Sequence, residues 1–336
     1  MQTFRFPHVF IMAVLCAISC NQKSNGETTE KSADGKETTS APKTEVAFDS
    51  TDYKKRMIAV ANGDTTGKWP ANAPISLPGA IFPYHRVVAY YGNLYSKKMG
   101  ILGELPKDEM LKKLDGEVKK WAAVDSTLPV IPALHYVAIT AQAAGETKRM
   151  RMPFHQIDSI VNWANEINGL VFLDIQVGWS TLQQEIPTLE KYLLMPKVHL
   201  GIDPEFSMKF GDVPGKRIGT FDATDINYAI SYLDNLVKKN NLPPKILVVH
   251  RFTQGMVTNA ANIKPTPGVQ VVMDMDGWGD KILKRSTWLR YIQKEPVQFA
   301  GFKLFYKNDL KKKDTAIYSP AELNKFIPKP IYIQYQ

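Results

Sequence analysis

Cysteine is almost absent from this chain of 336 residues. Its two cysteines, Cys16 and Cys20, both lie in an apolar N-terminal segment, and residues 21–336 contain none. A disulfide, a cysteine nucleophile and a thiolate metal site are therefore excluded from that part of the chain. We expect the fold to depend on a large apolar core instead, which a chain of this length can bury.

The sequence also lacks the motifs of several enzyme and binding classes. It contains no HExxH zinc motif, no GxSxG nucleophile elbow and no Walker phosphate-binding loop. It has no arginine-rich run with interleaved aromatic residues, so we expect no nucleic-acid partner. The net charge of +9 includes the lysine runs 111–121 and 236–245. Such runs are typical of solvated helix faces and loops, and an anionic partner is the alternative interpretation.

The first twenty residues have the pattern of an export signal. Arg5 is followed by an apolar run over residues 9–18, which is too short for an ordinary transmembrane helix. Cys20 follows Ala-Ile-Ser, which resembles a bacterial lipobox. We therefore expect residues 1–19 to be a lipoprotein signal peptide, with cleavage before Cys20 and lipid attached to it. A plain signal peptide that is cut nearby is the alternative.

The segment that follows is poor in large apolar side chains. Residues 20–45 consist mainly of Ser, Thr, Asn, Lys, Glu and Gly, a composition that does not offset the entropy cost of ordering. We expect this segment to be a disordered tether for a folded domain over residues 46–336. The predicted location is the cell envelope, with a membrane anchor at lipidated Cys20 and the domain facing the periplasm or the exterior.

From residue 86 onward, short runs rich in β-forming residues alternate with segments of helical periodicity. The eight runs are 86–93, 128–138, 169–178, 197–206, 245–253, 269–277, 299–306 and 329–336. Apolar residues recur at helical spacing in 107–124, 153–168 and 224–239. This alternation predicts an α/β fold, a single (β/α)8 TIM-type barrel over residues 46–336. An open doubly wound sheet is the alternative, although no glycine-rich phosphate loop follows the first run.

Polar residues gather at the C-terminal ends of these runs, after apolar beginnings. In a parallel barrel those ends lie on one rim, where the sites of this fold are found. We therefore expect one site that is built from the ends of several strands. Its candidate residues are Tyr91, His135, Asp174, Gln176, Asp203, Glu205, His250, Arg251, Asp274, Asp276, Lys303 and Tyr306.

Several of these residues also have a purely structural interpretation. Asp203 precedes a proline and could begin a turn, whereas Glu205 has no such role. Asp276 precedes a glycine and could form an Asx-turn, and His250 could be a buried core histidine. An ionised Asp174 inside a strand is costly unless it is paired, which favours a functional interpretation of that residue.

Glycoside hydrolysis suits a barrel mouth that is rich in carboxyl and aromatic groups. This reaction uses two carboxyl groups across the scissile bond, one as acid and one as base or nucleophile. We predict Glu205 as the general acid and Asp174 as the nucleophile or base. Asp203 would orient one of them or bind a sugar hydroxyl, and the other rim residues would bind a carbohydrate ligand. We expect no cofactor and no metal ion.

Two other functions fit the same residues. The protein could capture a glycan without cleaving it, because stacking and hydrogen-bonding residues suffice for binding. It could also be a metal-assisted phosphodiesterase, for which the basic surface would suit a phosphate ester. A hard cation such as Mg²⁺ or Ca²⁺ would then bind oxygen ligands and one imidazole. The candidate ligands are Asp174, Asp203, Glu205, Asp274 and His250.

A series of short motifs resembles a family of exported bacterial lipoproteins with a glycosidase-like (β/α)8 barrel domain. The motifs are GILGELP (100–106), LDIQVG (173–178), GIDPEF (201–206), IGTFDATDIN (218–227), VVHRFTQGMV (248–257), MDMDGWG (273–279), KLFY (303–306) and YIQYQ (332–336). The resemblance covers most of residues 85–336, and its most specific part is GIDPEF together with VVHRF. It implies that the rim residues belong to one site, and it implies no substrate or mechanism.

The lipoprotein hypothesis makes a direct prediction about Cys20. We expect Cys20→Ala to remain an unlipidated precursor, because the substitution removes the thiol that accepts the lipid. Incorporation of a radiolabelled fatty acid into the protein in cells checks this. Cys16→Ala, in the same segment, is the matched control and should be labelled like the wild type. Equal labelling of the Cys20 variant and the wild type would refute lipidation at this residue.

Overall fold

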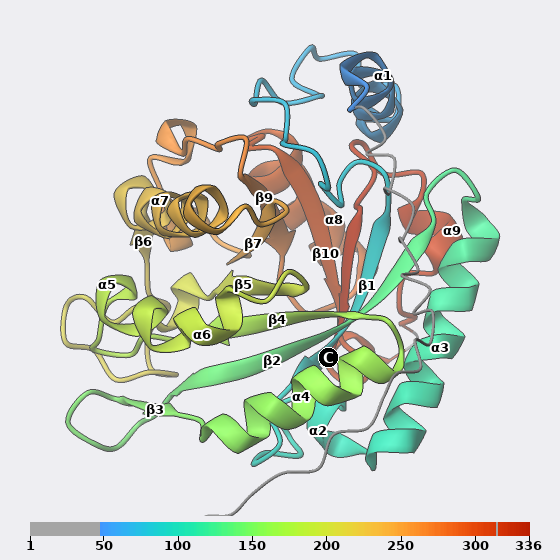
Figure 1. Cartoon of the computed structure of the whole chain (residues 1–336). Helices are drawn as coiled ribbons and strands as arrows, with labels where there is room; N and C mark the ends of the chain where they lie inside the picture. The colour runs from blue at the N-terminus through green and yellow to red at the C-terminus, as the bar shows by residue number, and fades with distance from the viewer. Residues whose placement is uncertain (1–47, 314) are drawn as a thin grey trace, which may run out of the picture. The chain divides into compact units, whose positions relative to one another are not determined.

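Eight parallel strands close into a barrel in the computed structural model, which describes residues 48–313 and 315–336 (Figure 1). The barrel strands are β1 (Arg86–Gly92), β2 (Val130–Ala141), β4 (Leu170–Ile175), β5 (Val198–Ile202), β7 (Lys245–Arg251), β9 (Val269–Met275), β10 (Phe299–Leu304) and β11 (Tyr332–Tyr335). They pair in chain order, and β1 pairs with both β2 and β11, which closes the barrel. Seven of the eight runs contain one of these strands and the run 128–138 overlaps β2, which continues to Ala141, so the predicted (β/α)8 TIM-type barrel is confirmed.

Three short strands lie outside the barrel. Strand β3 (Arg149–Arg151) pairs in the antiparallel sense with the last three residues of β2. Strands β6 (Phe221–Asp222) and β8 (Val257–Thr258) form a separate two-stranded sheet. The predicted signal peptide and tether, residues 1–45, lie outside the described residues. Within the described part of the chain, no helix is long and apolar enough to cross a membrane.

The helices that connect the strands vary greatly in length. The α-helices are α1 (Ser50–Ala61), α2 (Ile101–Glu104), α3 (Lys107–Val124), α4 (Phe154–Glu166), α5 (Leu182–Glu185), α6 (Glu190–Leu193), α7 (Ala223–Asn240), α8 (Lys281–Thr287) and α9 (Pro320–Leu323). The shorter helical turns are η1 (Ile186–Leu189), η2 (Pro204–Phe206), η3 (Gln254–Met256), η4 (Ala260–Asn262), η6 (Asn308–Leu310) and the π-helical η5 (Trp288–Gln293). The three helices predicted from periodicity correspond to α3, α4 and α7.

Periodicity and capping explain why the long helices form where they do. In α3 the residues Leu111, Leu114 and Trp121 are buried on one face, as the helical spacing of its apolar residues requires. Helix α7 begins at a capping box, in which the Asp222 side chain and the Asp225 side chain satisfy each other's backbone N–H groups. Both helices pack against strands of the barrel (Figure 1).

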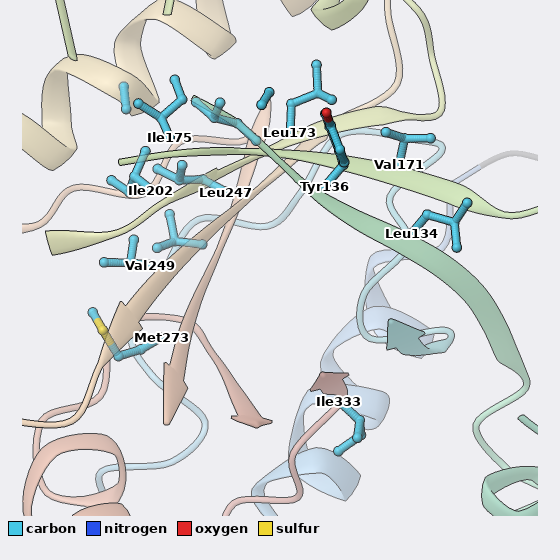
Figure 2. Close-up of a cluster of buried hydrophobic side chains, with 14 of the residues drawn as sticks. Leu134, Tyr136, Val171, Leu173, Ile175, Ile202, Leu247, Val249, Met273 and Ile333 are labelled. Carbon is cyan, nitrogen blue, oxygen red and sulfur yellow. The ribbon is translucent and has the colours of Figure 1, made fainter. Parts of the chain in front are cut away.

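Alternate residues of each strand face opposite sides of the barrel wall, because side chains in a strand point alternately in and out. The outward residues form the larger apolar cluster, part of which Figure 2 shows. These residues include Leu134, Tyr136, Val171, Leu173, Ile175, Ile202, Leu247, Val249, Met273 and Ile333. The helices cover this layer, which explains why the strand sequences are apolar on both faces.

The barrel interior changes from apolar to polar along the strands. Inward residues near the strand beginnings, such as Val87, Phe172 and Phe299, form a second apolar cluster with Tyr53 and Met57 of α1. Further along the strands, the inward positions carry polar groups. The register places Asp174 beside Gly201, His250 beside Asp274, and Asp274 beside Gly301. The polar layer of the barrel interior therefore lies next to this second apolar cluster, toward the carboxyl ends of the strands.

Gly201 is the position where the polar layer leaves no room for a side chain. A Cβ atom there would lie 2.5 Å from both Asp174 Oδ1 and His135 Nε2. We expect Gly201→Ala to reduce the free energy of unfolding by about 1–3 kcal/mol, the usual cost of overpacking a core. Urea unfolding followed by circular dichroism checks this.

The matched control is Gly116→Ala in the middle of α3, where an added Cβ meets nothing within 4 Å. This substitution should raise stability by about 0.5–1 kcal/mol, because alanine favours a helix interior over glycine. Equal stability effects of the two substitutions would contradict the close packing at Gly201.

Candidate active site

A cavity of about 570 Å³ opens where the barrel strands end. Its lining comes from strands or loops that are far apart in the sequence, as expected for the active end of this fold. The predicted rim residues that line it are Tyr91, Gln176, Asp203, Glu205, Asp276 and Lys303. The structure thus brings together acids from the ends of β5 and β9 with a lysine from β10.

Asp276 and Lys303 form an ion pair in the cavity wall. Lys303 Nζ lies 2.9 Å from Asp276 Oδ1 and 3.9 Å from the centre of the Tyr91 ring. On its other side, Asp276 Oδ2 lies 3.2 Å from His250 Nδ1. Burial alone would raise the pKa of Asp276, but the charges of Lys303 and His250 outweigh it and lower the pKa. Asp276 is therefore the ionised carboxylate of the cavity.

Glu205 is an acid of the cavity whose pKa is raised. It lies in η2, the turn that follows β5, and is only partly buried. Burial and then the negative charge of Asp276 raise the pKa of Glu205 to about 7, with partial opposition from Lys303 and His250. Two carboxyl groups in one cavity thus have pKa values shifted in opposite directions, which is the pattern of an acid and its ionised partner.

Asp203 has a structural role in positioning the turn. Its Oδ1 accepts a hydrogen bond from the Glu205 backbone N–H at 3.0 Å, and its Oδ2 accepts one from Gln176 Nε2 at 3.3 Å. Gln176 in turn accepts from the Ala141 N–H at 3.0 Å. Burial raises the pKa of Asp203 well above its usual value, with the charge of His250 opposing. These contacts hold the turn that follows β5, and the predicted role of Asp203 in orienting a catalytic acid stays a prediction.

Asp174 lies beneath the floor of the cavity and is completely buried. Its Oδ2 accepts a hydrogen bond from Tyr91 Oη at 3.0 Å and lies 3.5 Å from His250 Nε2. Its Oδ1 lies 3.6 Å from His135 Nε2. Burial would raise the pKa of Asp174, but the charge of His250 and the neighbouring His135 lower it well below the usual range.

His250 lies at the centre of this layer and carries a positive charge. Burial would lower the pKa of its imidazole, but the charges of Asp174 and Asp276 raise it well above the ordinary value. Asp274 is also buried beside it, with Oδ2 at 3.5 Å from His250 Nδ1, and burial raises the pKa of Asp274. His250 is thus a completely buried histidine that lies among three acids.

His135 connects the layer to the last strand of the barrel. Its Nδ1 lies 2.5 Å from Tyr332 Oη and 3.0 Å from Gln334 Nε2. Burial lowers the pKa of His135 to about 4, so this imidazole is neutral at physiological pH. Tyr332 and Gln334 were not among the candidate residues, although their alternation in the terminal YIQYQ is the signal of two inward positions.

Two predicted residues lie away from the cavity, on the outer side of the barrel wall. Arg251 follows the inward His250 and pairs with Glu295 at 2.8 Å. Tyr306 donates a hydrogen bond to Glu117 at 3.1 Å and stacks on Tyr335. Neither residue lines the cavity. Arg251 is one residue after the inward His250, and Tyr306 is three residues after the inward Lys303. Both side chains therefore point to the opposite side of the barrel wall.

Aromatic side chains complete the cavity wall. Trp278, which is 53% exposed, follows Asp276 by two residues and lies at the mouth. Phe206, Phe252 and Phe305 also line the cavity. Flat apolar faces beside hydrogen-bonding groups suit a ligand that has both kinds of surface, as sugars do.

The described residues include one group that could hold a metal ion. His135, Asp174 and His250 each offer a ligand atom, and these atoms lie within 4.8 Å of one another. Of the ligands expected for a hard cation, Asp174 and His250 belong to this group, whereas Asp203, Glu205 and Asp274 do not.

Comparison with known proteins assigns the chain to no family. It matches no protein-family model, and no curated protein matches it. The fold and the cavity define a class only, a (β/α)8 barrel with an acid-rich cavity at the carboxyl ends of its strands. Any specific chemistry has to follow from the side chains, because this fold supports many reactions.

The raised pKa of Glu205 predicts a pH dependence of stability. Between pH 4.5 and about 7 the folded protein keeps a proton on Glu205 that the unfolded chain loses, so stability falls as the pH rises through this window. Glu205→Gln removes this effect. We expect its melting temperature to match that of the wild type near pH 4 and to exceed it near pH 8.

Differential scanning calorimetry from pH 4 to pH 8 measures this difference. Glu146→Gln, on an exposed loop, controls for the loss of one carboxyl group. A difference between Glu205→Gln and the wild type that does not change with pH would contradict the raised pKa.

Proposed function

We propose that this protein is a glycoside hydrolase that acts on a polysaccharide or a cell-envelope glycan. The observation that carries the proposal is the pair of carboxyl groups in one cavity, with Glu205 at a pKa of about 7 and Asp276 ion-paired to Lys303 at 2.9 Å. Glycosidases need this combination of one proton-donating acid and one ionised carboxylate on either side of the scissile bond.

In this proposal Glu205 is the general acid. Its pKa lies close to neutral pH, where an acid can both hold its proton and release it to a leaving-group oxygen. The Asp203 side chain accepts a hydrogen bond from the backbone of the same turn, which limits the movement of Glu205 relative to β5. This is the role predicted for Glu205 from the sequence.

Asp276 takes the role of base or nucleophile that the sequence suggested for Asp174. Asp276 lines the cavity, whereas Asp174 is completely buried below it and is not part of the lining. A nucleophile or base has to come within hydrogen-bond reach of the substrate or its attacking water. Asp174 acts through His250 instead, because its charge favours a cation between the two acids.

The remaining lining residues suit carbohydrate binding. Trp278 and Phe305 offer faces for sugar rings, and Gln176 and Tyr91 offer polar groups near the acids. The proposal includes the location expected from the sequence, with the barrel held at the cell envelope through lipidated Cys20. A soluble glycan or a neighbouring cell-wall polymer would then reach the cavity from the solvent.

A screen of the full chain against bacterial surface and host polysaccharides tests the proposal, with reducing-end release and binding measured in parallel. For a glycan that is cleaved, Glu205→Gln and Asp276→Asn should each reduce turnover by about 10²–10⁴-fold while binding is retained. The double variant should lose much less than the product of the single losses, because the two groups act as a unit. Glu146→Gln serves as the control and should retain full turnover.

The other outcomes of the screen separate the alternatives. Release that persists in Glu205→Gln would refute the assignment of the acid. Binding without release for every glycan would favour a glycan-capturing lipoprotein. Turnover of phosphate esters alone, and only with added divalent metal, would favour the phosphodiesterase.

A further inference from the structure

Three buried atoms in the polar layer face one another without hydrogen-bond partners among the described residues. They are His135 Nε2, Asp174 Oδ1 and His250 Nε2. All three side chains are completely buried, and buried polar atoms are rarely left unpaired because the loss of hydration is costly. A positive charge among two imidazoles and a carboxylate is supplied either by a proton on His250 or by a metal ion that takes the place of that proton.

The ligand atoms of these three residues lie within 4.8 Å of one another, close enough to share one ion. His135 Nε2 lies 3.6 Å from Asp174 Oδ1, and His250 Nε2 lies 3.5 Å from Asp174 Oδ2. Ligands at zinc bond lengths of about 2.0–2.2 Å on a tetrahedron are about 3.3–3.6 Å apart.

The outer ring nitrogens lie near polar groups that could become their partners, although His250 Nδ1 makes no hydrogen bond to the described residues. His250 Nδ1 lies 3.2 Å from Asp276 Oδ2, which gives a carboxylate–histidine arrangement. His135 Nδ1 lies beside Tyr332 Oη and the Gln334 amide. A half-turn of this amide brings its buried Oε1, which has no partner among the described residues, to accept from His135 Nδ1. Both imidazoles could then donate outward and direct Nε2 toward the ion.

The rest of the layer is compatible with a bound cation. Tyr91 donates a hydrogen bond to the Asp174 carboxylate at 3.0 Å, as partners of ligating carboxylates commonly do. Gly201 lacks a Cβ at the point where one would meet Asp174 Oδ1 and His135 Nε2. Three acids lie within 3.5 Å of the His250 ring nitrogens, and their negative charge favours a cation in this layer.

We propose that His135, Asp174 and His250 form a buried site for a divalent transition-metal ion of the zinc class, below the floor of the cavity. The two-histidine, one-carboxylate ligand set suits a borderline ion better than the hard cations Mg²⁺ and Ca²⁺, which prefer oxygen ligands. The three ligands do not line the cavity, so metal binding can be measured separately from glycan turnover. Its outer partner Asp276 does line it, so a bound ion would fix the orientation of that carboxylate.

Metal binding by the full chain, purified without a histidine tag and stripped with a chelator, tests this proposal. We expect equilibrium dialysis against Zn²⁺, with the metal measured by mass spectrometry, to give one ion per chain. His135→Gln and His250→Gln should abolish this uptake. His155→Gln, which changes an exposed histidine at the start of α4, is the matched control and should retain it. Asp276→Asn should weaken binding by about 10–100-fold, the usual effect of removing an outer partner.

A second measurement uses the wild type alone, in case the histidine variants do not fold. Co²⁺ in place of Zn²⁺ should give the visible absorption of a four-coordinate ion, and Zn²⁺ should raise the melting temperature because it binds only the folded state. A folded wild type that takes up neither metal would overturn the proposal. Uptake that persists unchanged in both His135→Gln and His250→Gln would show that surface histidines bind the metal, and would overturn it equally. Neither result bears on glycan turnover, which the screen measures separately.

Discussion

The structure depends on how the barrel interior accommodates charge. An ionised group in a protein interior is costly unless opposite charges and hydrogen bonds compensate for the lost water. Here the compensation is a continuous series of alternating charges. Lys303 pairs with Asp276, Asp276 faces His250, and His250 faces Asp174. Each member would be unfavourable alone, so loss of any one leaves its neighbours buried and unpaired.

This arrangement is possible because the closed barrel fixes the register of its strands. The acids and the histidine come from β4, β7 and β9, and a one-residue slip in any of these strands would turn its polar residue into the outer apolar layer. The apolar cluster below, which includes Phe172 and Phe299, fills the other half of the interior. The scaffold therefore supplies a rigid, dry base, and the cavity above it meets solvent.

A second buried ion pair holds the cavity wall in place. Lys284 Nζ lies 2.8 Å from Asp309 Oδ2, and Asp309 accepts hydrogen bonds from the backbone N–H groups of Gly279 and Phe305, both at 3.0 Å. These contacts join the loop after β9 to the end of β10. Trp278 and Phe305 are consequently fixed relative to Asp276 and Lys303. Nothing in the spacing of Lys284 and Asp309 indicated this pairing, because the two residues meet only when the loops fold over the barrel.

The sequence by itself determined the architecture and the set of polar residues at the strand ends. Alternation of apolar runs with helical periodicity predicted the strands of the barrel, because strands that are buried on both faces have nearly continuous apolar sequences. Strand parity would also have separated the inward His250 from the outward Arg251, although both were included among the candidate site residues. Tertiary structure alone decided which acid faces the cavity and which lies below it, since Asp174 and Asp276 both look like charges at strand ends. Depth along the barrel axis depends on the stagger of the closed strands, and pKa depends on neighbours from other strands, so neither quantity can be read from local spacing.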